Sequence, residues 1–151
     1  MLSATAVATY EALMSEPFDY AVSLQVRHPT ATADHVAALV GLELQRGWTI
    51  GEARTTPTGG ALAGLRDETY CAFRLGQGSD GELAECLRAA IKLLKTRKAE
   101  LRQLRSDGGS LLLFASWQAN GDTGEVFEQS LLSDIAALGI DLGMNVLGSP
   151  A

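Results

Sequence analysis

The sequence predicts an α+β fold in which helices cover one face of a mostly antiparallel sheet. Four segments carry the two-residue alternation or the continuous apolar run that is typical of strands. Three others carry the 3.6-residue apolar period of helices. With one further short strand, the elements follow each other as β-α-β-β-α-β-α-β. The first six match a ferredoxin-like βαββαβ unit, which a C-terminal helix and strand extend.

The first strand is expected at residues 20–28, where large apolar residues alternate with small or polar ones. Pro29 ends the strand because proline has no backbone N–H to donate. A short helix follows, with Thr32 as its N-cap and Gly41 as its C-cap. One face of the strand would carry Tyr20, Val22, Leu24 and Val26, and the other Ala21, Ser23, Gln25 and Arg27.

The middle of the chain combines short extended pieces with a glycine-rich stretch. Residues 48–51 are interpreted as a short strand or a bend. Residues 55–64 contain three glycines and one proline among few large side chains, a composition that predicts a mobile loop. A second regular strand is expected at residues 69–75, with Tyr70 and Ala72 on one of its faces.

The longest helical pattern spans residues 79–105. Ser79 and Glu82 have the spacing of a capping box, in which each side chain accepts from the backbone N–H of the other. The apolar stripe is interrupted after Leu94, where basic residues fall on the same side, and resumes near the end. The helix therefore either kinks near Thr96 or projects its last turns beyond the sheet. A single helix with an overhanging end is the favoured interpretation.

The last third of the chain supplies two strands and a helix. Residues 110–118 are apolar on both faces, which predicts a strand that lies centrally and is covered on both sides. Residues 131–138 have a helical pattern that Gly139 closes. Residues 140–146 alternate again and make the final strand.

A chain of 151 residues with 46% hydrophobic residues predicts a single domain with its own core. We assign the domain to residues 19–148, after an N-terminal arm or loosely docked helix at residues 1–18. No apolar run approaches the ~20 residues of a membrane span, and the amino terminus lacks the basic start of a secretory signal. Cys71 and Cys86 are expected to be buried free thiols, which agrees with a reducing cytoplasm.

The charge of the chain is unevenly distributed. Residues 88–105 hold seven basic residues and one acidic residue, a formal charge of +6. Because the whole chain totals −6, the remainder carries −12. An acidic body with one basic ridge argues against nucleic acid as a partner. The ridge itself is either a solvated helix face or a contact for an anion or an acidic partner.

Five short stretches of the chain carry recognisable sequence signatures. They are 22–29 (VSLQVRHP), 40–44 (VGLEL), 48–54 (WTIGEAR), 69–73 (TYCAF) and 138–146 (LGIDLGMNV). Together they resemble the bacterial family of unknown function catalogued as DUF4279, with coverage of residues 19–147. The resemblance implies a fold and implies no reaction. The family pattern would place Trp near Cys71 and Asp near Asn145, and the second difference argues against carboxylate chemistry at the last strand.

The motifs of common catalytic and cofactor sites are missing from the sequence. His28 and His35 flank a strand–helix junction with no third ligand nearby, so no metal site is predicted. The glycines of residues 58–64 lack the Lys-Ser/Thr pair of a phosphate loop. A cysteine nucleophile would need a base and an exposed site, whereas both cysteines fall in predicted core positions. We therefore expect no cofactor and no catalytic residue, and a protein that is not an enzyme is the favoured interpretation.

Four arginines and one tryptophan are the candidate binding residues. They are Arg27, Trp48, Arg54, Arg66 and Arg74. If the arginines converge at the open sheet face or at the glycine-rich segment, they suit an anionic ligand or an acidic partner. Otherwise they are separate surface or ion-paired residues. Trp48 precedes a bend, so it is interpreted as an anchor that pins the following loop to the sheet, with ligand stacking as the alternative.

Two functional hypotheses follow. The favoured one is a non-enzymatic protein-binding or assembly module that forms a homodimer or binds another protein through its open sheet face and strand edges. A specific version is an immunity-like neutraliser of a basic protein such as a toxin. The alternative is a small-molecule or anionic-ligand site, with catalysis left open, that residues 55–64 roof and that Trp48, Arg54 and Arg66 surround. Neither hypothesis involves a membrane.

Overall fold

The structure is a computed structural model of the chain, and it describes residues 18–148. The strands are β1 (Asp19–His28), β2 (Arg46–Trp48), β3 (Ala53–Thr55), β4 (Ala61–Leu65), β5 (Thr69–Gly78), β6 (Ser110–Ala119) and β7 (Asp141–Gly148). The helices are α2 (Ala33–Val40), α3 (Leu83–Lys95), α4 (Lys98–Ser106) and α5 (Gln129–Ala137). The predicted N-terminal arm lies outside the described residues, except for Phe18.

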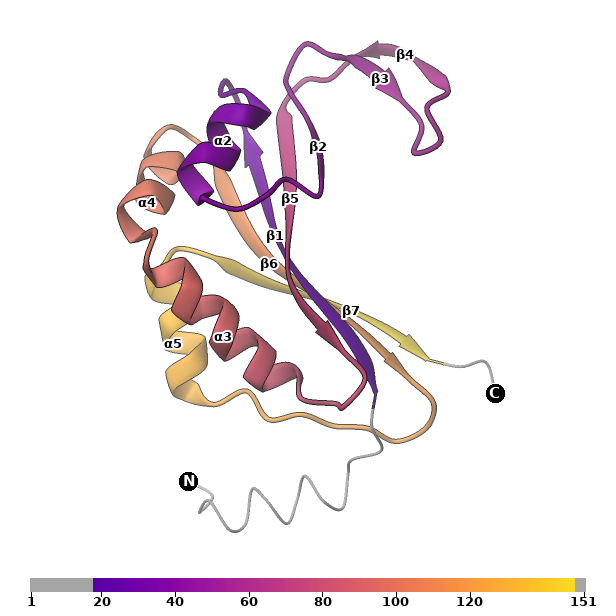
Figure 1. Cartoon of the computed structure of the whole chain (residues 1–151), viewed down its shortest axis with the longest axis vertical. Coiled ribbons are helices and arrows are strands. Elements are labelled where there is room, and N and C mark those ends of the chain that lie inside the picture. Colours follow the sequence, from indigo (N-terminus) through magenta and orange to yellow (C-terminus); the bar gives the residue numbers. More distant parts are fainter. Residues whose placement is uncertain (1–17, 149–151) are drawn as a thin grey trace.

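Five strands form one sheet in the order β2-β5-β1-β6-β7, and β3 and β4 form a separate two-stranded hairpin. The first four strands of this order form three antiparallel pairs, and their order is that of a ferredoxin-like unit. After α5 the chain adds β7 parallel to β6 at the sheet edge. The predicted α+β fold and its C-terminal extension are therefore confirmed (Figure 1).

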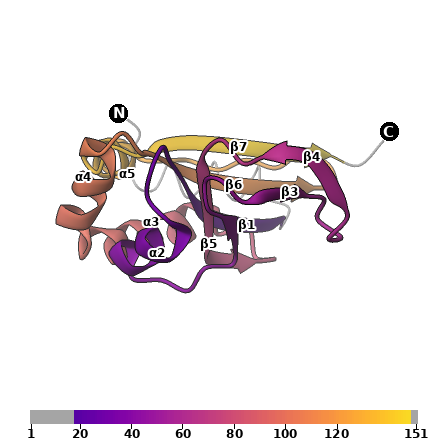
Figure 2. The same ribbon diagram turned by 90° about the horizontal axis from the view of Figure 1, so that it is seen from above.

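The helices gather on one face of the sheet (Figures 1 and 2). Helix α3 packs against β1 and β5, α2 against β5 and α4, and α5 against α3 and β7. Alternate residues of β1 and β6 are buried on this side, as period-two strands with one covered face should be. Leu87, Ile91 and Leu94 of α3 are buried, and they share the core with Val22, Leu24, Phe73 and Leu113 of the strands.

The expected single helix over residues 79–105 is wrong, and the alternative of a kink near Thr96 is correct. Helix α3 ends at Lys95. The Thr96 hydroxyl donates to the Leu93 carbonyl, and the backbone N–H groups of Thr96 and Arg97 donate to carbonyls three residues earlier instead of four. A new helix begins at Lys98 and turns away from the axis of α3 (Figure 1). The turn buries Leu101 and Leu104, so the resumed stripe reaches the core as a second helix.

The start of the helix also differs from the expected capping box. The first helical residue is Leu83, and the N-cap residue Glu82 makes no side-chain cap bond. Instead, the Asp80 carboxylate accepts from the Glu82 backbone N–H at 3.0 Å. Residues 80–82, which were predicted to be helical, thus form an Asx-type turn before α3.

The predicted loop at residues 55–64 is largely a hairpin. Strand β3 ends at Thr55 and β4 begins at Ala61, with a turn in which the Thr56 N–H donates to the Gly60 carbonyl at 2.8 Å. The preceding strand also starts earlier than expected, because β2 runs from Arg46 to Trp48. Together these corrections place Arg46 in the sheet and Arg54 in the hairpin.

The prediction that residues 110–118 are covered on both sides is wrong. Strand β6 is an inner strand, between β1 and β7, but only its helix-facing residues are buried. Leu112 and Phe114 on the opposite face are half-buried. These two apolar side chains therefore lie on the sheet face that the described helices leave open.

Thr69 ties the far end of the sheet to two neighbouring loops. Its hydroxyl donates to the Ala31 carbonyl at 2.5 Å and accepts from the Ile50 N–H at 2.9 Å, and the residue is fully buried. We expect Thr69→Val, which keeps the shape and removes both bonds, to lower the free energy of unfolding by about 1–3 kcal/mol. Urea unfolding measures this change. A loss below about 0.5 kcal/mol would mean that water or another group satisfies both backbone atoms.

Candidate functional site

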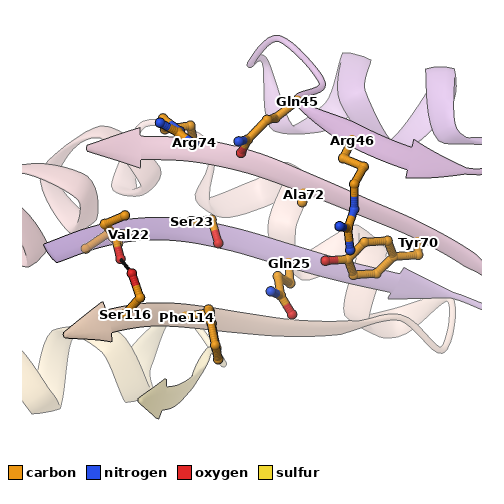
Figure 3. Close-up of a pocket in the computed structure, with 11 residues that line it drawn as sticks. Val22, Ser23, Gln25, Gln45, Arg46, Tyr70, Ala72, Arg74, Phe114 and Ser116 are labelled. Atoms are coloured by element: carbon orange, nitrogen blue, oxygen red, sulfur yellow. Dashed lines mark hydrogen bonds between the residues drawn. The ribbon is translucent and has the colours of Figure 1, made fainter. Parts of the chain in front are cut away.

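The face of the sheet that the helices of residues 18–148 leave open, which we call the helix-free face, contains a hollow of about 330 Å³ (Figure 3). Small residues of three strands form its floor: Ala21 and Ser23 on β1, Ala72 on β5 and Ser116 on β6. The Ser116 hydroxyl donates to the Ala21 carbonyl at 3.5 Å, so this polar group is turned into the sheet. The floor is consequently flat and open to a ligand or a partner.

Polar and aromatic side chains stand around this floor. In Figure 3, Arg46 and Tyr70 lie at one end, Arg74 and Gln45 lie along β5 and the chain before β2, and Phe114 lies along β6. The Arg46 guanidinium lies 5.8 Å from the centre of the Tyr70 ring. The Arg74 guanidinium donates to the Gln77 side chain. The rim of the hollow is therefore rich in hydrogen-bond donors.

A second hollow, of about 400 Å³, lies where the β3–β4 hairpin meets the sheet. Its lining residues are Arg27, Trp48, Arg54, Leu65, Arg66, Asp67 and Glu68. Four of the five residues predicted from the sequence are among them. We call this the hairpin hollow, and the one of Figure 3 the sheet hollow.

Stacked rings and guanidinium groups connect the two hollows. The Arg66 guanidinium lies 3.7 Å from the centre of the Trp48 ring, which packs at 4.8 Å against the ring of Tyr70. Arg27 lies 4.8 Å from the Tyr70 ring and pairs with the Glu68 carboxylate at 2.6 Å. Tyr70 is only 4% exposed, although it lies on the helix-free face, because these side chains cover it.

Every basic residue outside the helical ridge of residues 88–105 lines one of these hollows. There are five of them, all arginine, and they face only two lining carboxylates, those of Asp67 and Glu68. The lining residues of the two hollows thus carry a formal +3 in a chain of −6. Arginine is suited to this use because its planar fork can bind oxyanions and stack on rings at the same time.

Strand geometry explains why these residues meet. Arg27 and Tyr70 are direct partners across β1 and β5, and Trp48 is the partner of Tyr70 across β2 and β5. Directly paired residues point to the same side of a sheet, so all three side chains share the open face. Gly47 permits this pairing, since a Cβ atom there would stand 2.4 Å from the Tyr70 carbonyl oxygen.

The sequence-predicted residues therefore converge in part. Arg27, Trp48, Arg54 and Arg66 share the hairpin hollow, whereas Arg74 lines the sheet hollow. The interpretation of Trp48 as an anchor agrees with its contacts, because it packs between Tyr70 and Arg66. Sequence reasoning missed Arg46, because the expected strand began two residues too late. All lysines fall within the ridge, so every basic residue elsewhere is arginine, and this was the signal that could have found Arg46.

The groups with unusual acidity lie on the helix side and are not part of either hollow. Burial, with the Asp34 carboxylate adding to it, raises the pKa of the Cys71 thiol to about 11. Burial and the Asp80 carboxylate raise the pKa of Cys86, which is only half-buried and so differs from the fully buried position expected. Both shifts lower the thiolate fraction, and the thiolate is the reactive form.

We expect these two thiols to react slowly with a thiol reagent at pH 7.5 in the folded chain. Labelling of Cys71 should be at least about 100-fold slower than in the guanidinium-unfolded chain, because its raised pKa leaves little thiolate at this pH. Labelling of the half-buried Cys86 should also be slower than in the unfolded chain. Time-resolved labelling with mass detection measures the rate for each cysteine. Rapid labelling of the folded chain would contradict the burial of these side chains.

Three further findings concern the described part of the chain. No three His, Cys, Asp or Glu residues within it are grouped so that they could hold a metal ion. His28 is buried, and its Nδ1 accepts from the N–H groups of Thr30 and Ala31 at 3.1 and 2.9 Å, so it holds the turn after β1. Within residues 18–148 no helix is long and apolar enough to cross a membrane.

Comparisons with protein-family models, curated proteins and solved structures found no significant match to this chain. The resemblance to DUF4279 therefore stays a prediction.

Proposed function

We propose that this chain is a non-enzymatic binding module that holds an acidic segment of a partner protein on its helix-free sheet face. The observation that carries the proposal is the placement of arginine. All five basic residues outside the helical ridge line the two hollows of this face and its hairpin. Charge-assisted hydrogen bonds from guanidinium to carboxylate contribute about 1.5–3 kcal/mol each where solvent is excluded.

The shape of the sheet hollow favours an extended segment. Its floor is made of small side chains, and Phe114 offers apolar contact opposite the guanidinium groups. A chain that carries alternate acidic and apolar side chains can place one set toward Arg46 and Arg74 and the other toward Phe114. Nucleic acid is the less favoured partner, because the whole chain carries −6 and would repel a polyanion at long range.

A peptide that alternates glutamate with leucine tests the proposal when its binding is followed by fluorescence anisotropy. We expect Arg46→Gln combined with Arg74→Gln to weaken binding by about 10-fold or more. The matched control is Lys92→Gln combined with Lys98→Gln, which removes the same charge from the exposed helical ridge. An equal loss in both double variants would contradict the proposal, as would tighter binding of a single-stranded oligonucleotide at the same arginines.

We also propose that the chain forms a homodimer, and we place the contact at β7. Among residues 18–148 this strand is an edge that pairs with β6 alone. Its one charged residue is Asp141, and no lysine or proline protects it from pairing. In an antiparallel pairing about a two-fold axis at Met144, Leu142 would face Val146 of the second copy. The two Asp141 carboxylates would then lie at opposite ends of the contact.

Sedimentation at tens of micromolar tests this self-association. We expect a dimer for the natural chain and a monomer for Val146→Lys, because a charge at a paired edge disfavours association. Val146 is 62% exposed, so the substitution should leave folding intact. Leu65→Lys, at a residue that is 65% exposed on the hairpin, is the matched control and should remain dimeric. A natural chain that sediments as a monomer would remove the proposal.

The neutraliser hypothesis and the cytoplasmic location remain narrower proposals. A basic partner would have to bind the acidic surface outside the two hollows and the ridge. Failure of the chain to rescue cells from a co-expressed toxic neighbour would count against this version. The two free cysteines support a reducing compartment.

A further inference from the structure

The hairpin hollow contains two guanidinium groups that the backbone fixes in place. Arg54 on β3 donates through Nη1 to the Ala63 carbonyl on β4 at 3.2 Å. Arg66, just after β4, donates through Nη2 to the Thr55 carbonyl on β3 at 3.0 Å. Each arginine therefore bonds to the opposite strand of the hairpin. Both side chains are oriented before any ligand arrives, which lowers the entropy cost of binding one.

Neither of these guanidinium groups has a carboxylate partner among the described residues. The ion pairs of residues 18–148 involve Arg27, Arg88 and Lys95, and none involves Arg54 or Arg66. Arg27 is neutralised locally by Glu68. Two positive charges therefore remain in a hollow whose other acidic lining residue is Asp67.

The Arg66 guanidinium is also incompletely hydrogen-bonded. Its Nε atom is shielded from solvent and has no hydrogen-bond partner in the described part of the chain. The Trp48 ring covers one face of the guanidinium group at 3.7 Å. An enclosed N–H without an acceptor destabilises the folded chain, and more so on a charged group. Such groups call for an explanation, and an anion that is bound in the natural state is one.

We propose that the hairpin hollow is a binding site for a small oxyanionic molecule whose carboxylate or phosphate group lies between Arg54 and Arg66. The volume of about 400 Å³ fits a small organic molecule rather than a bare ion alone. Asp67 and Glu68 at the rim favour a ligand that also carries a hydrogen-bond donor. This site differs from the sheet hollow in its arginines and in its ligand, so it does not rest on the acidic-partner proposal.

Fluorescence of Trp48 offers a direct readout, because Arg66 lies on its ring. Citrate and inorganic phosphate are titrated separately into a Trp117→Phe chain, which leaves Trp48 as the one tryptophan. We expect a saturable change with a dissociation constant below about 1 mM for at least one probe. Calorimetry on the unmodified chain should give the same constant. Saturation by citrate alone assigns carboxylates as the ligand class, and saturation by phosphate alone assigns phosphates.

Single variants locate the site. Arg54→Gln and Arg66→Gln should each weaken binding by about 10-fold or more, because each removes a charge-assisted fork. Arg54→Lys, which keeps the charge and loses the fork, covers the case in which the glutamine variant does not fold, and it should also weaken binding. Arg74→Gln, in the other hollow, should bind as the unmodified chain does.

Three outcomes would overturn this inference. The first is the absence of a saturable response to either probe up to about 20 mM, a range in which even weak sites fill. The second is unchanged binding in the Arg54 and Arg66 variants. The third is equal weakening in Arg74→Gln, which would indicate a general charge effect. Loss of peptide binding to Arg46 and Arg74 would leave the inference intact, so the two proposals fail separately.

Discussion

Replacing Leu87 with alanine is expected to lower the free energy of unfolding by about 2–5 kcal/mol. Leu87 is fully buried on the side of α3 that packs against β1 and β5. The truncation removes apolar contacts and leaves a cavity that the rigid strands beneath can close only partly. Since a domain of this size is stable by about 5–15 kcal/mol, the variant should unfold at clearly lower urea concentration.

Leu93→Ala is the matched control for this prediction. It makes the same chemical change in the same helix, at a residue that is 47% exposed. Its loss should stay below about 1 kcal/mol, because less surface is uncovered and no cavity forms. Similar losses in the two variants would mean that this side of α3 does not face the sheet.

Replacing Gly47 with alanine is expected to have the second large effect, and to act on both stability and binding. The added Cβ would lie 2.4 Å from the Tyr70 carbonyl oxygen and 3.2 Å from the Cys71 Cα, so β2 must move away from β5. Overpacking of this kind costs about 1–3 kcal/mol. Arg46 and Trp48 would move with the strand, so peptide and oxyanion binding should both fall.

Gly148→Ala is the control for the glycine substitution, because a Cβ atom there would meet nothing within 4 Å. We expect its unfolding free energy and both affinities to match those of the natural chain within about 0.5 kcal/mol. If Gly47→Ala also left binding unchanged, the contact of β2 with β5 would not position the site.

The fold was predictable because its strong patterns act locally. Period-two alternation in β1 and β6 marks which side faces the helices, and the caps at Thr32 and Gly41 mark the ends of α2. The antiparallel arrangement of β2, β5, β1 and β6 then follows from the element order. These features depend on residues a few positions apart, which sequence inspection can see.

The break between α3 and α4 was harder to predict because helical period alone permits a continuous rod. Thr96 is compatible with the interior of a helix. Whether the helix continues or breaks there depends on whether Leu101 and Leu104 can be buried in the core. That core includes α2, which packs against α4 and lies far away in the sequence. A local pattern therefore left two solutions, and tertiary packing selected the bent one.

The sequence predicted most residues of the candidate site, but not that they separate into two hollows. The sequence shows that arginine is the only basic residue outside residues 88–105, and it left open whether these arginines converge or lie apart. It could not show that Arg74 would be separated from Arg54 and Arg66, because the hairpin at β3 and β4 looked like a loop. The role of Arg46 followed only from the register of β2 against β5.

Nuclear magnetic resonance of arginine Nε–H groups tests most directly whether the helix-free face is the binding surface. The acidic peptide is added to ¹⁵N-labelled chain, and the resonances of all arginines are followed. The account predicts that Arg46 and Arg74 shift while Arg88, Arg97, Arg102 and Arg105 on the helical ridge do not. Shifts confined to the ridge would contradict it and would place the partner on the opposite side of the molecule.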